Sequence, residues 1–324
     1  MTISMPNSSN SISVVIATYN GAQYLREQLD SILAQTHQPY ELIIQDDCST
    51  DETVAIIQEY LPHLPIQFEI NPVNIGYIHN FELALSKARG EFIALCDQDD
   101  VWESNKLELL LSHIGDNSLI YSNSLLIDSD GDSLKKTLAE KLNNRFISTH
   151  SPIAFVYDNC VSAHALMFRR SLLQQLFPFP GTLYFDAWIA ANAASAHGIT
   201  YMDQPLVRYR QHSTNTLAQT AKPRSSLFKK IALKAEKKSL EHRNSAQMIS
   251  DLLHISTLSS TERDTLESLK KAHLSFETSW FNLTLFRLLN RHKKYLFAIT
   301  RRNPWIVALK KAIGLKLYRF FPFL

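Results

Sequence analysis

The amino-acid sequence predicts an α/β fold with a parallel sheet, followed by a basic and mostly helical C-terminal region. Over residues 12–122, short apolar runs alternate with amphipathic stretches, and strands that alternate with helices form parallel sheets. Residues 222–324 contain 21 Lys or Arg and 7 Asp or Glu, whereas residues 1–221 contain 12 and 24. The chain therefore has an acidic part and a basic part, although its net charge is only +2.

The first four elements are each predicted by a local pattern. Residues 12–17 are apolar and predict a buried strand, and apolar side chains then recur at helical spacing from Leu25 to Leu33. Residues 42–44 predict a second buried strand. The residues from Ser49 to Glu52 have the spacing of a capping box, which predicts a second helix that runs to Leu61.

The next three elements continue the alternation. Polar and apolar residues alternate over residues 66–70, which predicts a strand with one exposed face. A helix is expected over about residues 77–88, with Gly90 as its stop. Residues 92–96 predict another buried strand, which ends directly before Asp97.

The rest of the chain is less regular. Residues 123–150 are polar and are expected to form a loop. An Ala-rich helix is expected near residues 186–197, before an apolar stretch near residues 199–209. The predicted parts of the chain are a domain over residues 1–221, its halves over residues 12–122 and 123–221, and a helical region over residues 222–324.

Polar side chains follow three of the predicted strands at the point where each strand ends. They are Thr18 to Asn20, Asp46 with Asp47, and Asp97 to Asp100. Ligands of parallel α/β sheets bind beyond the carboxyl ends of the strands. Closely packed carboxylates raise each other's pKa unless a cation or a hydrogen-bond donor neutralises them. We therefore predict a metal site that holds phosphates at this edge, and a solvated turn is the alternative.

Composition disfavours several classes of protein. The three cysteines are scattered without CxxC spacing, so neither a zinc site nor a disulfide framework is expected. Residues 1–10 are polar, so a secretory signal is not expected there. No apolar run reaches the roughly 18 residues that a membrane span needs. We expect the protein in the cytoplasm, peripheral on the cytoplasmic face of the inner membrane.

Six stretches of the sequence together resemble a known family. The family 2 glycosyltransferases have motifs similar to four of them, SVVIATYNGAQYLREQLDSILAQT, ELIIQDDCSTDET, NIGYIHNF and ARGEFIALCDQDDVW. The rhamnosyltransferase-like branch of that family has stretches that resemble FDAWIA and DQPLVRYRQH. The resemblance covers about residues 12–215. It implies a GT-A fold, with a nucleotide-binding half and an acceptor-binding half, and sugar transfer from a nucleoside diphosphate with inversion at the anomeric carbon.

The resemblance implies a divalent metal site. Asp97, Gln98 and Asp99 match the DxD motif of the family. Asp99 would bind Mn²⁺ or Mg²⁺ directly, and Asp97 would contact the ribose or a metal-bound water. His212 matches a family histidine near the metal or the diphosphate, and we predict it as a second ligand. Asp100 either joins this site or caps the next helix.

The resemblance also implies which residues bind the rest of the donor. Asp46 and Asp47 occupy the position of an acid that binds the uracil or thymine base. The sequence does not separate the two; we prefer Asp46 slightly and expect the other acid to stabilise the turn. Tyr19 would stack on that base or be a core aromatic, and Arg210 is preferred over Arg208 as a phosphate ligand. The other predicted donor-binding residues surround the base or lie in a nearby loop: Ala17, Thr18, Asn74 and Gly76.

The predicted acceptor side centres on Asp186. It matches the family position of the base that deprotonates the acceptor hydroxyl, and an N-cap of the Ala-rich helix is its alternative. Trp188 is predicted to pack or to line the acceptor site. Ser162 and Ala163 stand where a Thr-Gly pair is common in the family, and we assign them to the acceptor pocket.

The end of the chain is strongly basic. After Glu277 the sequence has ten Lys or Arg and no acid. Trp, Phe and Leu residues lie between these charges, a composition typical of a helix on an anionic membrane surface. A helical cap on the catalytic domain and an oligomer interface are the alternatives. Nucleic-acid binding is not expected, because residues 1–221 are acidic.

These observations predict an inverting, metal-dependent glycosyltransferase that extends a lipid-linked bacterial surface glycan. The donor would be dTDP-rhamnose or a UDP-sugar. A sugar nucleotidyltransferase is one alternative, although the stretch ATYNGAQY lacks the basic, Gly-rich phosphate loop of that class. A non-catalytic, membrane-docked subunit of a polysaccharide assembly complex is the other alternative.

Overall fold

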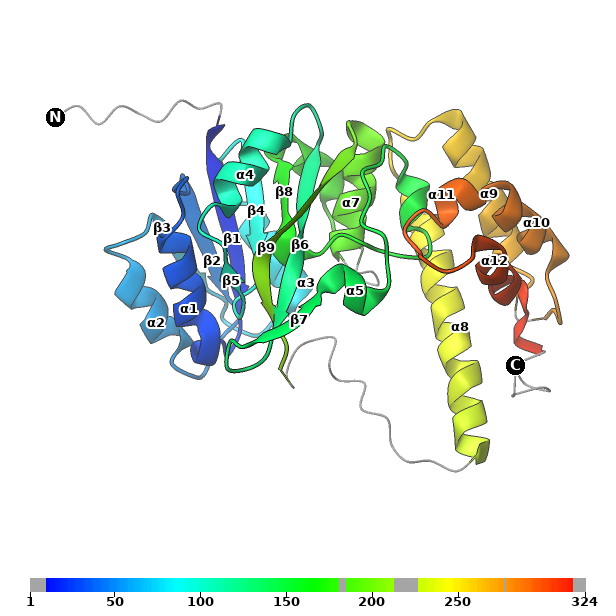
Figure 1. The fold of residues 1–324 in the computed structure, drawn as a ribbon, viewed down its shortest axis with the longest axis horizontal. Coiled ribbons are helices and arrows are strands. Elements are labelled where there is room, and N and C mark those ends of the chain that lie inside the picture. The colour runs from blue at the N-terminus through cyan, green and yellow to red at the C-terminus, as the bar shows by residue number, and fades with distance from the viewer. Residues whose placement is uncertain (1–9, 181–184, 213–226, 277, 317–324) are drawn as a thin grey trace.

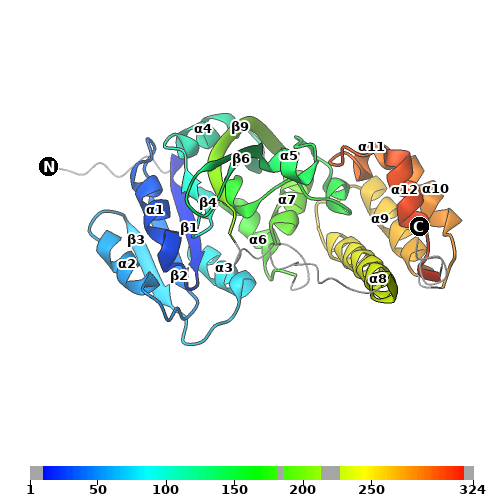
Figure 2. The ribbon, with the colours of Figure 1, turned by 60° about the horizontal axis from the view of Figure 1, so that its bottom comes forward.

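The computed structural model describes residues 10–180, 185–212, 227–276 and 278–316, and for residues 227–235 it describes the helix without its side chains. In these residues, helices flank one mixed sheet, and further helices gather at one end of the molecule (Figures 1 and 2). The predicted α/β fold with a helical C-terminal region is confirmed. The predicted boundary between residues 221 and 222 and the basic and aromatic residues at 317–324 lie outside the described residues.

The described strands belong to one sheet with the order β3-β2-β1-β4-β8-β6-β9-β5, and β7 pairs with β6. The strands are β1 (Ile12–Thr18), β2 (Glu41–Asp46), β3 (Ile66–Ile70), β4 (Phe92–Cys96), β5 (Val101–Trp102), β6 (Leu119–Ile127), β7 (Ser133–Thr137), β8 (Leu166–Arg169) and β9 (Ile199–Arg210). The pairs β3-β2, β2-β1 and β1-β4 are parallel, as predicted. Their carboxyl ends therefore meet at one edge.

Apolar side chains on both faces of the sheet pack against the flanking helices and form two core clusters. On one face, Leu29, Ile57 and Leu107 lie in one cluster, and on the other face Phe81 and Ile189 lie in the second. The helices that contribute these residues are α1 (Ala22–Leu33), α2 (Thr53–Tyr60), α4 (Lys106–His113), α3 (Tyr77–Leu85) and α7 (Phe185–Ala196).

The predicted capping box at the start of α2 is wrong. Helix α2 begins at Thr53, and its N-cap residue Glu52 makes no capping bond with its side chain. Ser49 is not available as a cap, because its N–H and hydroxyl donate to the carboxylate of Asp46 at 2.8 and 2.6 Å. Asp51 instead accepts from the N–H of Thr53 at 3.0 Å.

The predicted loop over residues 123–150 is also wrong. Strand β6 extends to Ile127, and it is followed by β7 and by helix α5 (Leu138–Leu142). Three polar residues, Ser122, Asn123 and Ser124, gave this part of the sequence the composition of a loop, but all three are buried in the structure. Their side chains are tolerated inside the sheet because each makes a hydrogen bond, for example from Ala139 N–H to Asn123 Oδ1.

The helical region packs on the acceptor half as a cap. Its helices are α8 (Leu227–Leu252), α9 (Ser260–His273), α10 (Leu283–Arg291), α11 (Lys293–Leu296) and α12 (Pro304–Ala312). Leu266, Leu285 and Phe297 belong to the same core cluster as Phe155 and Ile189 of the catalytic part. The predicted alternative of a helical cap is confirmed for the described residues. Among them, we find no helix with the length and hydropathy that a membrane span requires.

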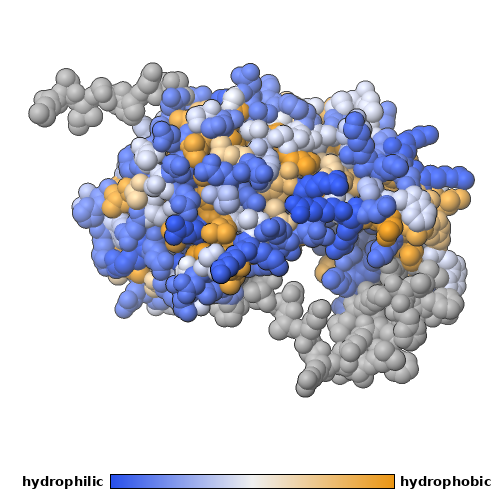
Figure 3. Space-filling view, viewed as in Figure 1, coloured by the Kyte–Doolittle hydropathy of each residue, from blue (hydrophilic) through white to orange (hydrophobic). Residues whose placement is uncertain are grey.

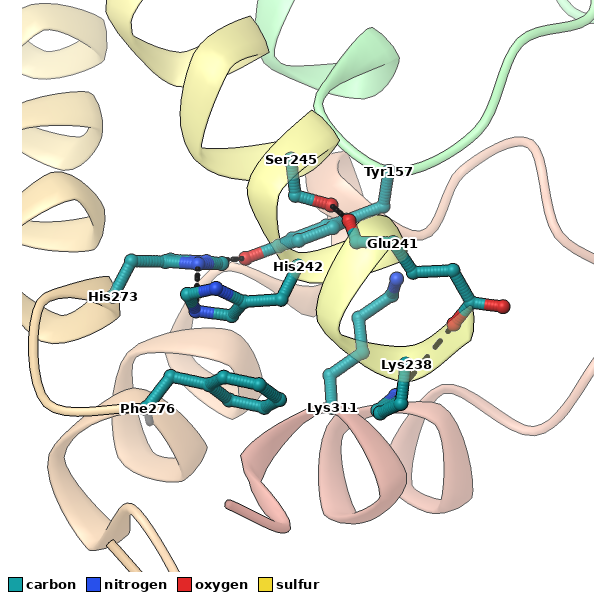
Figure 4. Close-up of a pocket in the computed structure, with 8 residues that line it drawn as sticks. All are labelled: Tyr157, Lys238, Glu241, His242, Ser245, His273, Phe276 and Lys311. Atoms are coloured by element: carbon teal, nitrogen blue, oxygen red, sulfur yellow. Dashed lines mark hydrogen bonds and ion pairs between the residues drawn. The ribbon is translucent and has the colours of Figure 1, made fainter. Parts of the chain in front are cut away.

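A chain of hydrogen bonds joins the cap to the catalytic part (Figure 4). Tyr157 lies 2.9 Å from His273 Nε2, and His273 Nδ1 lies 2.8 Å from His242 Nε2. The ammonium of Lys311 lies 4.3 Å from the centre of the Tyr157 ring. Burial, together with nearby lysine charge, lowers the pKa of His242 to about 4, and burial lowers the pKa of His273 to about 3. Both rings are therefore neutral in this junction at pH 7.

The neutral histidines predict that acid weakens this junction. The unfolded chain binds protons at His242 and His273 as the pH falls below about 6.5, whereas the folded chain does not, so stability is lost between about pH 6.5 and 4. Urea unfolding at pH 7.5 and 5.0 measures this loss. The variant His242→Asn should lose less stability between the two pH values, and an equal loss in both proteins would contradict the assignment.

Candidate functional site

The predicted donor residues at the ends of β1 and β4 are brought together. The amide of Gln98 makes two hydrogen bonds to the backbone of Tyr19, at 2.9 Å from the N–H and 3.1 Å to the carbonyl. The Tyr19 side chain is 48% exposed, so it is not a core aromatic. Gly21 makes this contact feasible, because a Cβ there would lie 2.3 Å from Gln98 Oε1. Gly21 was not predicted, since a glycine in a turn has many explanations.

The two acids after β2 have different partners. Asp46 accepts from the hydroxyl of Thr18 at 2.7 Å and from Ser49, so it stabilises the turn at the strand end. Asp47 accepts from the N–H groups of Ile75 and Gly76, both at 2.8 Å. Asp47 therefore holds the loop that contains the predicted residues Asn74 and Gly76 against the sheet edge. Their contact with a base stays a prediction.

Asp99 faces His212 across the site. Asp99 Oδ2 lies 2.9 Å from His212 Nε2, and the two side chains are 22% and 12% exposed. Burial and the neighbouring charge of Asp97 raise the pKa of Asp99, and His212 opposes this shift. A carboxylate oxygen and an imidazole nitrogen that are close, accessible and short of positive charge fit a divalent cation.

The assignment of Arg210 to a phosphate needs correction. Its side chain is fully buried, and Nη2 donates to Glu27 at 2.6 Å. Nε donates to the carbonyl of Asp99 and Nη1 to the carbonyl of Ser129, each at 3.0 Å. The Arg210 N–H also donates to the carboxylate of Asp100 at 3.0 Å, so Asp100 does not cap α4, whose N-cap is Asn105. Arg210 holds the acidic loop in place.

Asp186 lies in the first turn of α7 and is partly exposed. One of its carboxylate oxygens accepts from the N–H of Ala187 at 2.7 Å. Burial raises the pKa of Asp186 to about 7, and the charge of Asp97 adds to the rise against the Ala187 bond. Because α7 begins at Phe185, Asp186 is not the residue ahead of the helix. A carboxylate with a pKa near 7 suits a general base at neutral pH.

Two predicted acceptor residues are part of the core. Trp188 is 6% exposed, and its indole N–H donates to the carbonyl of Leu176 at 3.0 Å. Ala163 is 8% exposed. Both therefore pack inside the protein, and the assignment of Trp188 and Ala163 to an acceptor surface is corrected. Ser162, which is partly exposed, stays a prediction.

The sequence was compared with models of known protein families. The model described as glycosyl transferase family 2 matches residues 13–177, about half of the chain. The chain belongs to this family. The resemblance to the family 2 glycosyltransferases is thereby confirmed.

Relatives and solved structures agree with this family. A Bacillus subtilis relative, TuaG, provisionally named a teichuronic acid biosynthesis glycosyltransferase, is 32% identical over 163 residues, which are 48% of this chain and 59% of TuaG. The first curated relatives in Mycobacterium are likewise matched over 59% of their length. The structure of TarS from S. aureus in complex with UDP-GlcNAc has a TM-score of 0.61 at 18% identity, over 95% of this chain and 89% of that one.

A second solved structure is similar in fold. The mannosyltransferase PcManGT from Pyrobaculum calidifontis, in complex with GDP-Man and Mn²⁺, has a TM-score of 0.51 at 16% identity, over 98% of this chain and 90% of that one. At these identities the likeness concerns the fold, and the GT-A prediction is confirmed by it.

Three residues near this site, Glu27, Lys106 and His164, were not predicted. Glu27 pairs with Arg210. His164 lies 3.6 Å from Asp97, and the ammonium of Lys106 donates to the His164 carbonyl at 2.6 Å. Each lies far along the chain from its partner, so no local motif marks these pairs. For Lys106, the available signal in the sequence was a lysine at the start of a mostly apolar predicted helix.

Proposed function

We propose that this chain is an inverting, metal-dependent transferase that moves a sugar from a nucleoside diphosphate donor to a hydroxyl group of a bacterial surface glycan. The observation that carries the proposal is the approach of Asp99, after β4, to His212, after β9, at 2.9 Å. It unites the predicted DxD motif with the predicted histidine at the strand ends, where such sheets bind ligands. The complexes of TarS with UDP-GlcNAc and of PcManGT with GDP-Man and Mn²⁺ support the donor class and the metal.

The reaction uses the residues in separate roles. Asp99 and His212 would hold Mn²⁺ or Mg²⁺, and the cation would supply positive charge for the departing diphosphate. Gln98 and Tyr19, locked to each other, shape the base side of the donor pocket. Asp186 accepts the proton of the acceptor hydroxyl as its oxygen forms the bond to the anomeric carbon and the bond to the diphosphate breaks. One displacement of this kind inverts the anomeric carbon.

The donor and the acceptor are inferred from the family resemblance and from similar proteins. The resemblance to the rhamnosyltransferase-like branch favours dTDP-rhamnose, and the TarS complex favours a UDP-sugar. The name of TuaG supports a cell-surface polysaccharide as the product. We place the acceptor on a lipid carrier at the cytoplasmic face of the inner membrane, because the cap presents a basic and aromatic surface.

Thermal unfolding with a panel of nucleotides tests the donor class. A nucleoside diphosphate at 100 times its Kd stabilises the folded state by about 2.7 kcal/mol. We expect dTDP or UDP to raise the unfolding temperature when Mn²⁺ or Mg²⁺ is present, and to do so much less with EDTA. Nucleoside monophosphates without a metal are the control. A folded protein that responds to no nucleotide would contradict the proposal.

The proposed membrane surface lies on α10 and α12. Phe286 packs edge-on against Trp305 at 6.0 Å between ring centres, and both line a groove with Arg287 and Arg291. Trp305 and Ile306 are 51% and 45% exposed. Over the helical region at the right of Figure 3, hydrophobic and hydrophilic side chains lie next to one another. Exposed aromatic groups beside arginines suit an anionic bilayer surface.

Vesicle binding tests this surface. The full chain should sediment with vesicles of phosphatidylglycerol and phosphatidylcholine, but not with phosphatidylcholine alone. Replacing Arg287 and Arg291 together by Gln should weaken binding about 30-fold, because each near-surface charge contributes about 1 kcal/mol. The control replaces Lys270 and Lys271 of α9 by Gln, which changes the net charge equally. Equal loss in both variants would show that no particular surface is used.

A further inference from the structure

His164 is fixed in the core with one ring nitrogen directed at the acidic loop. It lies in a short 3₁₀ helix, Ala163–Ala165, ahead of β8, and it is 3% exposed. Its Nε2 lies 2.8 Å from the hydroxyl of Ser124, and its ring stacks on Tyr209 at 4.3 Å between ring centres. Its Nδ1 lies 3.6 Å from Asp97 Oδ2 and 3.9 Å from Asp100 Oδ2.

Asp100 carries a buried oxygen that the protein does not satisfy. The Asp100 side chain is 0% exposed. Its Oδ1 accepts from the Arg210 N–H at 3.0 Å, but its Oδ2 has no hydrogen-bond partner among the described residues. A buried carboxylate oxygen without a partner is costly. The carboxylates of Asp97 and Asp99 in the same loop add further negative charge beside this oxygen, which a bound cation would offset.

The ammonium of Lys106 is directed at groups other than these carboxylates. Its ammonium donates to the His164 carbonyl at 2.6 Å and lies 3.3 Å from the centre of the Trp102 ring. Among the described residues, no ion pair joins Lys106 to Asp97 or to Asp100. The acidic loop has three carboxylates in four residues, and Arg210 is already paired with Glu27. A bound cation would offset the remaining negative charge of this loop.

The spacing of the three groups fits a metal ion. One ligand atom each from Asp97, Asp100 and His164 lie within 4.8 Å of one another. Ligand atoms about 2.0–2.2 Å from a metal lie roughly 3 to 4.4 Å apart. The 3.6 and 3.9 Å separations from His164 are too long for hydrogen bonds and lie in that range. In the tautomer whose Nε2–H donates to Ser124, Nδ1 presents a lone pair to the two carboxylates, as in metal-binding histidines with a partner on the other nitrogen.

We propose that Asp97, Asp100 and His164 bind a divalent cation without any nucleotide, at a site separate from the one at Asp99 and His212. Two carboxylates and one imidazole favour Mn²⁺ or Zn²⁺ over Mg²⁺ and Ca²⁺, which take oxygen ligands. The cation joins the acidic loop after β4 to the 3₁₀ helix before β8. It thereby holds Asp97 and Asp99 in position before the donor arrives. The site needs no donor, so it does not depend on the proposed transfer reaction.

Metal stoichiometry tests the proposal. The full chain is stripped with EDTA, and bound Mn²⁺ is counted by electron paramagnetic resonance with and without UDP or dTDP. We expect one equivalent without nucleotide and a second with it. His164→Ala should keep only the nucleotide-dependent equivalent. The matched variant His212→Ala should keep only the nucleotide-free one. A nucleotide-free equivalent that persists in His164→Ala would overturn the proposal. So would its absence from the wild type both for Mn²⁺ by this method and for Zn²⁺ by elemental analysis.

Thermal unfolding of Asp100→Asn provides a second readout if His164→Ala does not fold. Without nucleotide, Mn²⁺ or Zn²⁺ should raise the unfolding temperature of the wild type but not that of Asp100→Asn. If the metal stabilises both proteins equally, Asp100 is not a ligand and the proposal fails. Failure of the transfer reaction would instead appear as a missing nucleotide-dependent equivalent with the nucleotide-free one intact.

Discussion

Replacing Asp186 by Asn lowers the rate of sugar transfer by about 10²- to 10⁴-fold, the usual contribution of a positioned general base. Asparagine keeps the shape of the side chain but does not accept a proton from the acceptor hydroxyl. Donor affinity should change little, because the base acts on the other substrate. The measurement is the steady-state rate with saturating donor, beside the Kd for the nucleoside diphosphate.

The matched control for this variant is Asp203→Asn, which neutralises an exposed acid on β9. It should leave both quantities unchanged. If Asp186→Asn turned over at the wild-type rate, the base would have to be another group.

The variant Asp186→Asn should also fold well. With the pKa of Asp186 raised to about 7, the folded chain retains a proton that the unfolded chain loses above about pH 4, so the acid reduces stability as the pH rises through 7.

The same pKa predicts the pH dependence of transfer. Asp186 must be ionised to accept a proton, and its pKa is about 7. The rate should therefore rise with pH up to about 7 and then level off. In Asp186→Asn, the residual rate should lack this acid limb.

Replacing Asp99 by Asn removes metal-dependent nucleotide binding. The variant loses one of the two proposed metal ligands and one negative charge, and loss of a direct ligand should weaken metal affinity by more than about 100-fold, beyond the 10- to 100-fold typical of outer-shell changes. Isothermal titration with UDP or dTDP in the presence of Mn²⁺ measures the effect. Asp203→Asn again serves as the control, and equal affinity in Asp99→Asn and wild type would remove Asp99 from the site.

Much of the donor half could be predicted from the sequence because its strands are continuous apolar runs. Residues 12–17, 42–44 and 92–96 are buried on both faces, and parallel pairing then places Thr18, Asp46 and Asp97 at one edge. Local pattern and three-dimensional fold agree there.

The acceptor half and the network behind the acidic loop could not be predicted in the same way. Strand β6 places Ser122, Asn123 and Ser124 in the core. Polar residues are expected in the core only when they have hydrogen-bond partners, and the sequence does not show those partners. Arg210 is 183 residues from Glu27 along the chain, so its burial and its pairing follow from the tertiary fold alone. The pattern of the sequence therefore suggested a phosphate ligand where the structure has an internal ion pair.

The most direct test of the central claim is to identify which bond of the donor breaks. Purified full-length protein is incubated with dTDP-rhamnose and a panel of UDP-sugars in Mn²⁺, with water or an added glycan as acceptor, and products are followed by ³¹P and ¹H nuclear magnetic resonance. We predict metal-dependent release of a nucleoside diphosphate, with the freed or transferred sugar first formed as the opposite anomer. In a parallel reaction with added pyrophosphate, formation of a sugar 1-phosphate and a nucleoside triphosphate would instead indicate a nucleotidyltransferase. No cleavage of any donor by the folded protein in either reaction would point to a non-catalytic subunit.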